Sequence, residues 1–160
     1  MVTAVVGRKG GSAKSTTALH LAAAFSDLGR TALIELDAEN ASLIEYGQGR
    51  SLPFLVTDGP TWDEQHAQER WDHIVVDGYA RPNNRQLQGL ARLSDLLVIP
   101  TPPDALSLRV LARFLPTVAE TGGRFRVLLT MVPPFPSREG ERAKRDLASG
   151  GMRLAHNLEG

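Results

Sequence analysis

Cysteine is absent from the 160-residue sequence, which excludes disulfide bonds and iron–sulfur clusters held by thiolates. No apolar run approaches the ~20 residues that a membrane-spanning helix needs. The apolar run from Val2 to Val6 is too short for the core of a signal peptide. We therefore expect a cytoplasmic protein that does not bind membranes.

Lysine is also scarce, because the sequence has only Lys9, Lys14 and Lys144, and the first two lie in one glycine-rich segment. Arginine supplies the other positive charges, and 18 basic residues balance 18 acidic ones. A chain of zero net charge has no overall attraction for nucleic acid or anionic lipid, so either would need a local patch. The length fits one domain with one core.

Short apolar runs alternate with helical patterns along the chain. We expect strands at residues 2–6, 31–36, 52–57, 73–77, 95–99 and 125–131, and a last one at 152–155. We expect helices at residues 15–28, 61–70, 83–93, 104–121 and 137–149, and an irregular segment at 38–49. This alternation predicts one α/β domain, a three-layer α/β/α arrangement with a mostly parallel twisted sheet. The order of the strands does not follow from the pattern.

The segment from Gly7 to Thr16 lies between the first predicted strand and the first predicted helix, where phosphate-binding loops occur. Glycines let backbone N–H groups turn inward around an anion, and the helix N-terminus adds partial positive charge. Lys14 adds a full charge for the β- and γ-phosphates, and the Ser15 hydroxyl is a ligand type that Mg²⁺ prefers. A turn without function is the alternative, which the joint presence of these residues disfavours. The candidate nucleotide-binding residues are Lys9, Gly10, Gly11, Ser12, Ala13, Lys14, Ser15 and Thr16.

This loop departs from the usual Walker A pattern. Arg8 and Ala13 replace the two glycines of that pattern, and an additional lysine, Lys9, precedes Gly10 and Gly11. The form Lys-Gly-Gly-x-x-Lys-[Thr/Ser] is the deviant Walker A motif, and the sequence resembles the ParA/MinD family of ATPases. The resemblance implies that Lys9 reaches the partner's phosphates across an ATP-bound dimer, as an arginine finger does. If the backbone at Ala13 were left-handed, its strain would be about 1 kcal/mol.

Asp37 follows the second predicted strand, where the family usually reads Asp-x-Asp-Pro-Gln. The sequence retains the second aspartate as Asp37 and has Glu35, Ala38 and Glu39 in place of the first aspartate, the proline and the glutamine. By resemblance, Asp37 positions the attacking water. Glu35 is a candidate to contact the metal through water, with a longer side chain than aspartate. A loop cap without a catalytic role is the alternative for Asp37.

Asp77 ends the strand predicted at residues 73–77, and four strand-forming residues followed by an aspartate form a Walker B pattern. Its carboxylate is expected to hold a Mg²⁺-bound water beside Ser15. Gly78 resembles the glycine at this point in small plasmid-type ParA proteins, and allows close backbone approach. By resemblance, segments 100–103 and 130–134 flank the adenine, at strand ends where parallel sheets bind ligands. Connections stiffened by proline are the alternative.

ParA proteins fit best among the relatives that share this loop. The nitrogenase iron protein needs cysteine ligands, MinD proteins end in an amphipathic membrane helix, and bacterial tyrosine kinases of this class carry a tyrosine cluster. The resemblance implies an ATPase that partitions plasmids or chromosomes, with ATP and Mg²⁺ as ligands and Lys9, Lys14 and Asp37 as catalytic residues. Its ATP-bound homodimer would bind DNA non-specifically, associate with the nucleoid and be reset by a ParB-type partner. A nucleotide-binding switch or scaffold with little hydrolysis and no DNA binding is the alternative.

Two sets of arginines are candidates for a DNA surface. Arg109 and Arg113 lie four residues apart in one predicted helix, and Arg138, Arg142 and Arg145 lie among acidic neighbours in the last one. A solvated helix face is the alternative for either set.

The resemblance also bears on the extent of the domain. ParA proteins usually continue beyond the last strand with a further loop and helix that are implicated in DNA binding. We therefore expect residues 1–160 to form a ParA-like ATPase domain without that segment, either as a short family member or as a fragment.

Overall fold

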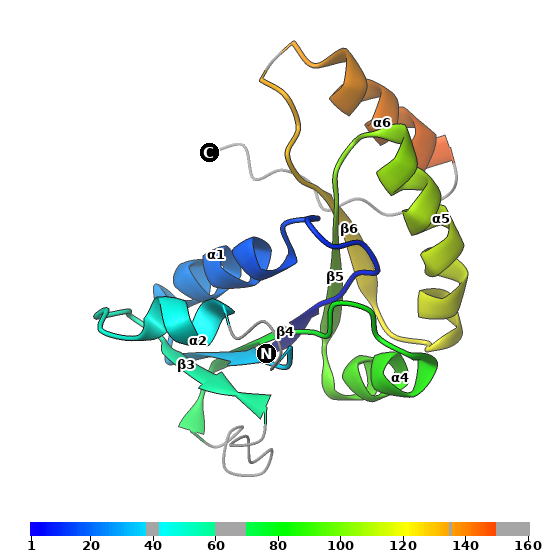
Figure 1. Ribbon diagram of the computed structural model, residues 1–160. Coiled ribbons are helices and arrows are strands. Elements are labelled where there is room, and N and C mark those ends of the chain that lie inside the picture. Colours follow the sequence, from blue (N-terminus) through cyan, green and yellow to red (C-terminus); the bar gives the residue numbers. More distant parts are fainter. Residues whose placement is uncertain (38–41, 60–69, 135, 150–160) are drawn as a thin grey trace.

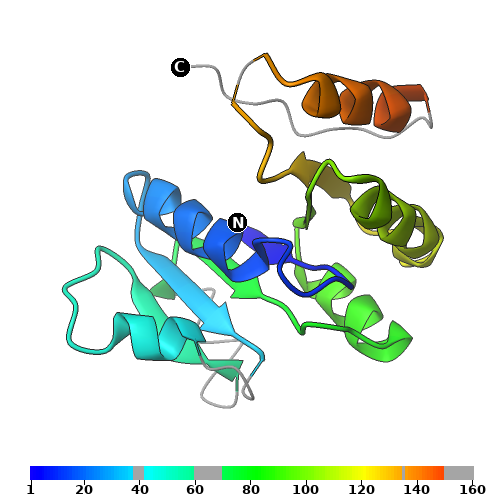
Figure 2. The same ribbon diagram turned by 45° about the horizontal axis from the view of Figure 1, so that its top comes forward.

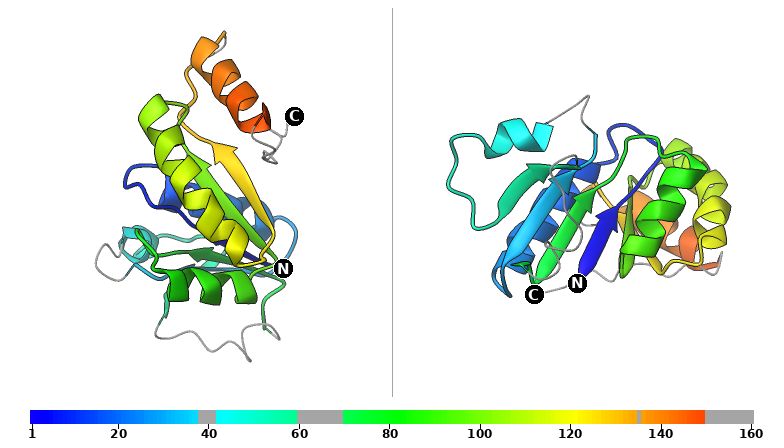
Figure 3. Two further views of the ribbon diagram at one scale, coloured as in Figure 1. Left: turned by 90° about the vertical axis from the view of Figure 1, so that its right-hand side faces the viewer. Right: turned by 90° about the horizontal axis from the view of Figure 1, so that it is seen from below.

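The computed structural model describes residues 1–37, 42–59, 70–134 and 136–149, and six of its strands form one parallel sheet. The strand order is β3-β2-β4-β1-β5-β6. These strands are β1 (Val2–Val5), β2 (Thr31–Glu35), β3 (Leu55–Asp58), β4 (His73–Asp77), β5 (Leu96–Thr101) and β6 (Phe125–Leu129). Since every pairing is parallel, the carboxyl ends of the strands share one edge of the sheet (Figure 3).

Helices cover both faces of this sheet (Figure 1). Helix α1 (Lys14–Ser26) and the short α2 (Ser42–Gly47) pack on one face, and α4 (Asn84–Leu93) and α5 (Ala105–Glu120) pack on the other. Helix α6 (Arg138–Ser149) adds Leu147 to the core on the α4–α5 side. The predicted three-layer α/β/α fold is confirmed. None of the helices in the described ranges is long and apolar enough to cross a membrane.

Close packing of α1 on the sheet positions the first turn of that helix. Ala18 and Ala22 are fully buried against Val5, Leu33 and Val75 on the strands. Because alanine is small, the helix approaches the strands closely. The N-terminus of α1 therefore lies directly above the ends of β1 and β4.

Helix α5 is fixed on the opposite face by an apolar stripe. Leu111, Phe114, Leu115 and Val118 follow helical spacing and are all buried. Burying each such side chain contributes about 1.5–3 kcal/mol. Asp104 caps the helix by accepting a hydrogen bond from the Ser107 backbone N–H at 2.9 Å. The N-terminus of α5 thus lies at the same edge of the sheet as the N-terminus of α1.

The segment expected to be irregular contains a helix, so that prediction was wrong. Helix α2 forms because the Glu35 carboxylate, which comes from β2, accepts hydrogen bonds from backbone N–H groups of Leu43 and Ile44. A pattern within residues 38–49 does not contain this long-range cap. The other described strands and helices agree with the predicted ones, with some differences at the ends. The helix expected at 61–70, apart from its last residue, and the strand expected at 152–155 lie outside the described residues.

The start of α4 allows a direct test of the fold. Asn83 accepts a hydrogen bond from the Gln86 backbone N–H, and the Gln86 side chain accepts one from the Asn83 backbone N–H, each at 2.9 Å. We predict that Asn83→Ala lowers the free energy of unfolding by about 1 kcal/mol, because this capping box is removed. Urea denaturation measures it. Asn84→Ala is the matched control, since Asn84 is exposed within the first turn. Equal losses of stability in the two variants would contradict the cap.

Candidate functional site

The predicted phosphate loop joins β1 to α1 at the carboxyl edge of the sheet, beside the end of β4 (Figure 2). The Gly78 backbone N–H donates to the Val5 carbonyl at 3.0 Å. A Cβ at Gly78 would lie 2.8 Å from that carbonyl oxygen, so glycine is required where β4 leaves the sheet. The Thr130 hydroxyl donates to the Ser12 carbonyl at 3.1 Å, which connects the segment after β6 to the loop.

Two residues of the loop have left-handed backbone. Gly11 has φ 72°, and Ala13 has φ 65° and ψ 29°. Glycine adopts this conformation freely, whereas for alanine it costs roughly 1–2 kcal/mol. The conditional expectation of strain at Ala13 is therefore confirmed. The strained residue immediately precedes α1, and its carbonyl accepts the first helical hydrogen bond, from the Thr17 backbone N–H at 2.8 Å.

Lys14 and Asp77 form an ion pair at the centre of this edge. Lys14 Nζ lies 2.5 Å from Asp77 Oδ1, and the two side chains are only 11% and 1% exposed. The phosphate loop and the Walker B strand, which are 63 residues apart in sequence, thus meet through buried opposite charges. A buried pair of this kind has a large desolvation penalty and contributes little net stability.

The surroundings of the Asp77 carboxyl raise its pKa, so an added cation would be favourable there. Burial raises its pKa most, and the negative charge of Glu35 raises it further. The positive charge and hydrogen bond of Lys14 lower the pKa of Asp77, as does the Ser15 hydroxyl to a smaller extent. A second positive charge here would stabilise the ionised carboxylate and relieve the repulsion from Glu35.

Two buried polar atoms of the site have no hydrogen-bond partner within the described part of the chain. They are Asp77 Oδ2 and the Ser12 hydroxyl. Buried polar groups are nearly always paired, so a ligand that pairs them fits here. A phosphate oxygen suits Ser12, and a water bound to Mg²⁺ suits Asp77. The described residues contain no cluster of three acidic or histidine side chains that could hold a metal, and Mg²⁺ commonly keeps several waters and binds substrate phosphates.

Lys9 contacts the start of α5, whereas Lys14 contacts Asp77. Lys9 Nζ donates to the Ser107 hydroxyl at 2.5 Å and lies 3.6 Å from Asp104 Oδ2. The pKa of Asp104 is lowered chiefly by its hydrogen bonds from Ser107 and further by Lys9. The Lys9 side chain remains 39% exposed, so it is accessible at the surface. Asp104 was expected from the sequence to begin this helix, but no local pattern indicates its contact with Lys9.

Asp37 and Glu35 lie at the end of β2, next to Asp77. Glu35 and Asp77 are Cα partners in the β2–β4 pairing, and the Leu36 backbone N–H donates to the Asp77 carbonyl at 3.0 Å. Asp37, which is half-buried, is the next residue. The structure therefore brings Asp37 and Asp77 to one edge, as expected from sequence. The Glu35 carboxylate, which was a candidate to contact the metal through water, contacts the start of α2. Ala38 and Glu39, which follow Asp37, lie outside the described residues.

Met131 is a further residue that the sequence analysis did not single out. It follows β6 in the segment predicted to flank the adenine, and it has φ 53° with 61% of its surface exposed. A left-handed, exposed methionine combines strain with an unburied apolar side chain. Nothing in the local sequence indicates positive φ at a non-glycine residue.

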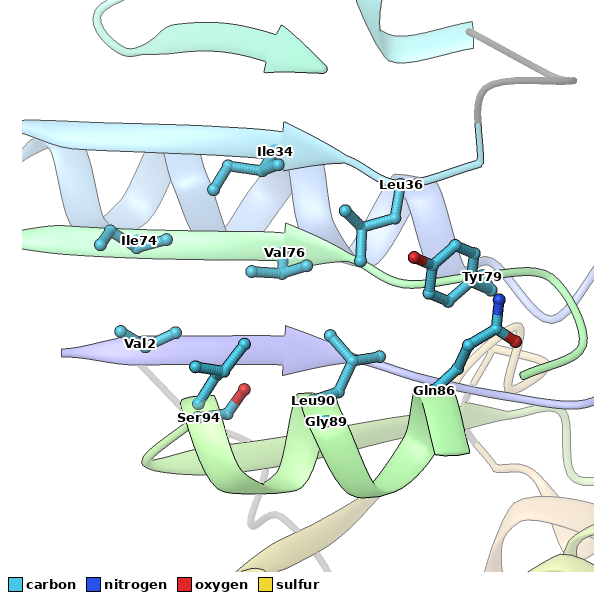
Figure 4. Close-up of a pocket in the computed structure, with 11 residues that line it drawn as sticks. Val2, Ile34, Leu36, Ile74, Val76, Tyr79, Gln86, Gly89, Leu90 and Ser94 are labelled. Atoms are coloured by element: carbon cyan, nitrogen blue, oxygen red, sulfur yellow. The ribbon is translucent and has the colours of Figure 1, made fainter. Parts of the chain in front are cut away.

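An apolar pocket of about 260 Å³ lies on the face of the sheet that α4 covers, opposite the face covered by α1. It is bounded by α4 and the strands β1, β2 and β4 (Figure 4). Ile74 and Val76 lie on its strand side, and Leu90 of α4 faces them, while Tyr79 and Gln86 lie together at one end. Among the described residues that line it, none is charged. The pocket therefore does not suit phosphates, and it is separate from the phosphate loop.

Comparisons with known proteins agree with this geometry. The family model described as the CobQ/CobB/MinD/ParA nucleotide binding domain matches residues 3–154. A maintenance of carboxysome distribution protein A from Gloeobacter kilaueensis is 32% identical over 156 residues, which cover 94% of this chain and 72% of that protein. The chain belongs to the ParA/MinD family of nucleotide-binding domains.

Solved structures show the same fold at low sequence identity. Apo McdA from Cyanothece has a TM-score of 0.74 at 15% identity, covering 98% of this chain and 86% of that one. A putative plasmid partition protein from Borrelia burgdorferi B31, bound to AMPPNP, has a TM-score of 0.67 at 15% identity, covering 92% and 80%. Cobyrinic acid a,c-diamide synthase from Mycobacterium smegmatis, with bound ATP analog and magnesium, has a TM-score of 0.69 at 15% identity, covering 92% and 81%.

The strain at Ala13 allows a test of the loop geometry. We predict that Ala13→Gly leaves the free energy of unfolding unchanged or raises it by up to about 1 kcal/mol, because relief of the left-handed strain exceeds or offsets the added freedom of the unfolded chain. Ala112→Gly is the matched control: Ala112 is exposed in the middle of α5, and its replacement should cost about 1 kcal/mol. Thermal and urea denaturation measure both. An equal loss of stability at position 13 would contradict the left-handed backbone.

Proposed function

We propose that this protein is a slow, partner-stimulated ATPase that binds Mg-ATP at the phosphate loop. The buried Lys14–Asp77 pair, with the unpaired Asp77 Oδ2 beside it, is the observation that carries this proposal. Both groups have the charge and position that a nucleotide phosphate and its metal ion need. The complexes of relatives with AMPPNP, and with an ATP analog and magnesium, support the choice of ligand.

In the proposed mechanism, Lys14 leaves Asp77 and donates to the β- and γ-phosphates, while backbone N–H groups from Gly10 to Thr16 surround them. The Ser15 hydroxyl and Asp77 Oδ2 would hold the magnesium ion, Asp77 through a water. When bound, that ion neutralises charge that develops on the phosphate oxygens. Asp37, at the neighbouring strand end, orients the water that attacks the γ-phosphate.

Lys9 acts in trans in this proposal. It projects from the loop at the surface, and its ammonium group contacts two polar side chains at the start of α5. In an ATP-bound homodimer, Lys9 exchanges the Ser107 and Asp104 contacts for the phosphates of the partner subunit. Hydrolysis and dimerisation are therefore coupled.

We further propose that the dimer binds DNA through α5 and distributes a cargo over the nucleoid. Arg109 and Arg113 are exposed, and no ion pair joins either to an acidic residue in the described ranges. On α6, by contrast, Arg142 lies 3.8 Å from Asp146, and Lys144 is paired with an acid of its own helix. Arg138 and Arg145 have no ion pair in the described ranges either, but their helix α6 carries three acidic residues, whereas α5 carries only Glu120. The α5 set is thus the less neutralised one.

The relatives favour two kinds of cargo. The carboxysome distribution protein is 32% identical, and the plasmid partition protein shares the fold. In either case a ParB-type partner, or a cargo adaptor with the same task, would stimulate hydrolysis and reset the dimer. Plasmid or chromosome partitioning and carboxysome positioning are therefore two uses of one cycle.

A nucleotide-binding switch with little hydrolysis is the second candidate. Lys9 is bound within its own subunit, and the Glu35 carboxylate is engaged by α2. Both observations favour a protein that rests in an inactive state. ATP turnover measured with and without DNA and a partner separates the two candidates.

The two loop lysines should have different roles in ATP binding. We predict that Lys14→Ala weakens ATP binding by about 10- to 100-fold or more, because the variant lacks a charge-assisted hydrogen bond to phosphate worth roughly 1.5–3 kcal/mol. Lys9→Ala should retain ATP binding by the monomer and lose ATP-dependent dimerisation and hydrolysis together. Lys144→Ala, on the exposed face of α6, is the control. Calorimetry measures binding, and light scattering measures dimerisation. Unchanged affinity in Lys14→Ala, or normal dimers in Lys9→Ala, would contradict these assignments.

The DNA surface is tested by salt dependence. We predict that random duplex binds in the presence of ATP. Replacing Arg109 and Arg113 by alanine should reduce the log–log salt slope by about 0.9 for each DNA phosphate that the variant no longer neutralises. Replacing Arg142 and Arg145 by alanine is the matched control, with the same change in charge. A larger effect of replacing Arg142 and Arg145 would show that the DNA-binding surface lies on α6. Equally weak binding with and without ATP would contradict DNA binding by these residues.

A further inference from the structure

Glu35 is a charged side chain buried at the end of a central strand. It is 2% exposed, and β2 is buried along its whole length. A buried carboxylate is unfavourable unless its oxygens are hydrogen-bonded. The proposed mechanism gives Glu35 no role, so its contacts require a separate account.

The hydrogen bonds of the Glu35 carboxylate connect it to the first turn of α2. The carboxylate accepts hydrogen bonds from the Leu43 backbone N–H at 3.1 and 3.2 Å, the Ile44 backbone N–H at 3.1 Å and the Ser42 hydroxyl at 3.3 Å. Backbone N–H groups in the first turn of a helix have no partner inside that helix. The carboxylate supplies that partner, and its negative charge suits the helix N-terminus.

The sequence positions give this contact a second consequence. Asp37 lies two residues after Glu35, and Ser42 begins α2, so the Glu35 carboxylate joins the end of β2, close to Asp37, to the start of α2. On its other side, β2 is held to β4, because the Leu36 backbone N–H donates to the Asp77 carbonyl. The backbone just before Asp37 is thus held next to the proposed metal-binding carboxylate.

We propose that Glu35 is a positioning residue, which ties the end of β2 to the first turn of α2 and thereby holds Asp37, two residues further on, beside the phosphates. This inference rests on the proposed ATPase function. It assigns to Glu35 a task different from metal binding through water, because the carboxylate oxygens face backbone N–H groups. Because an aspartate at position 35 is one methylene shorter, we expect that it would not reach them.

Hydrogen exchange of the nucleotide-free, unmodified chain gives the first test. Leu43 and Ile44 should exchange their backbone amide protons at least about tenfold more slowly than Arg85, because a hydrogen bond to a charged group protects them. Arg85 is the matched reference, since it lies in the first turn of α4. Exchange of Leu43 and Ile44 as fast as Arg85 would overturn the proposal without any substitution.

Two substitutions then separate the effect of side-chain length at position 35 from the effect of its charge. Glu35→Asp keeps the charge and shortens the reach, whereas Glu35→Gln keeps the length and replaces one acceptor oxygen by an NH₂ group. In both, exchange at Leu43 and Ile44 should accelerate about 10- to 100-fold, while Leu87 and Leu90 of α4 stay protected and report an intact fold. Glu45→Gln, a change at an exposed residue of α2 itself, is the control and should leave the exchange rates in both α2 and α4 unchanged.

Kinetics complete the test by comparing turnover with binding. Both Glu35 variants should lower kcat by about 10- to 100-fold, because Asp37 is misplaced, and should keep the Kd for Mg-ATP within about twofold of the unmodified chain. Accelerated exchange with unchanged kcat would overturn the positioning role. Normal turnover and magnesium dependence in Glu35→Asp, with loss only in Glu35→Gln, would overturn it in favour of a charge that acts on the metal. An unmodified chain without any turnover would contradict the ATPase alone, and the exchange rates would still decide whether Glu35 holds α2.

Discussion

Lys14 Nζ and Asp77 Oδ1 lie 2.5 Å apart where the first turn of α1 meets the end of β4, and both side chains are almost completely buried. Two buried charges stabilise a fold little, and apolar residues of similar volume often do better. In the proposed function, the pair supplies a cation for phosphates and a carboxylate for a metal-bound water, since Asp77 Oδ2 has no hydrogen-bond partner in the described part of the chain. Close packing of Ala18 and Ala22 on the sheet makes this approach possible.

The remaining parts of the site are arranged around that pair along one edge of the parallel sheet. Gly78 allows β4 to pass close to the Val5 carbonyl, and the left-handed Ala13 turns the loop into α1. The end of β2 is held to β4 on one side and to α2 on the other. Strain and buried charge are thus concentrated where the proposed chemistry takes place, as expected of a functional site.

Local patterns predicted the fold class, because each strand and helix depends on residues close together in sequence. The phosphate loop and Asp77 were likewise proposed from local patterns, and Asp37 from the family resemblance; the structure places all three at one edge of the sheet, and their roles stay predictions. Contacts between distant residues were not predictable in the same way. Lys9 binds Ser107, 98 residues away, and Glu35 caps a helix from a neighbouring strand. Helix α2 was missed for that reason, since in the described part of the chain its first turn is capped from Glu35. The strand order likewise depends on pairings that no single segment contains.

A crystal structure with Mg²⁺ and a non-hydrolysable ATP analogue tests the central claim most directly. The account predicts that Lys14 Nζ, now 2.5 Å from Asp77, lies within hydrogen-bond distance of a phosphate oxygen. It also predicts that Asp77 Oδ2 faces a water bound to the metal. A nucleotide bound away from the loop, with the Lys14–Asp77 ion pair intact, would contradict the account.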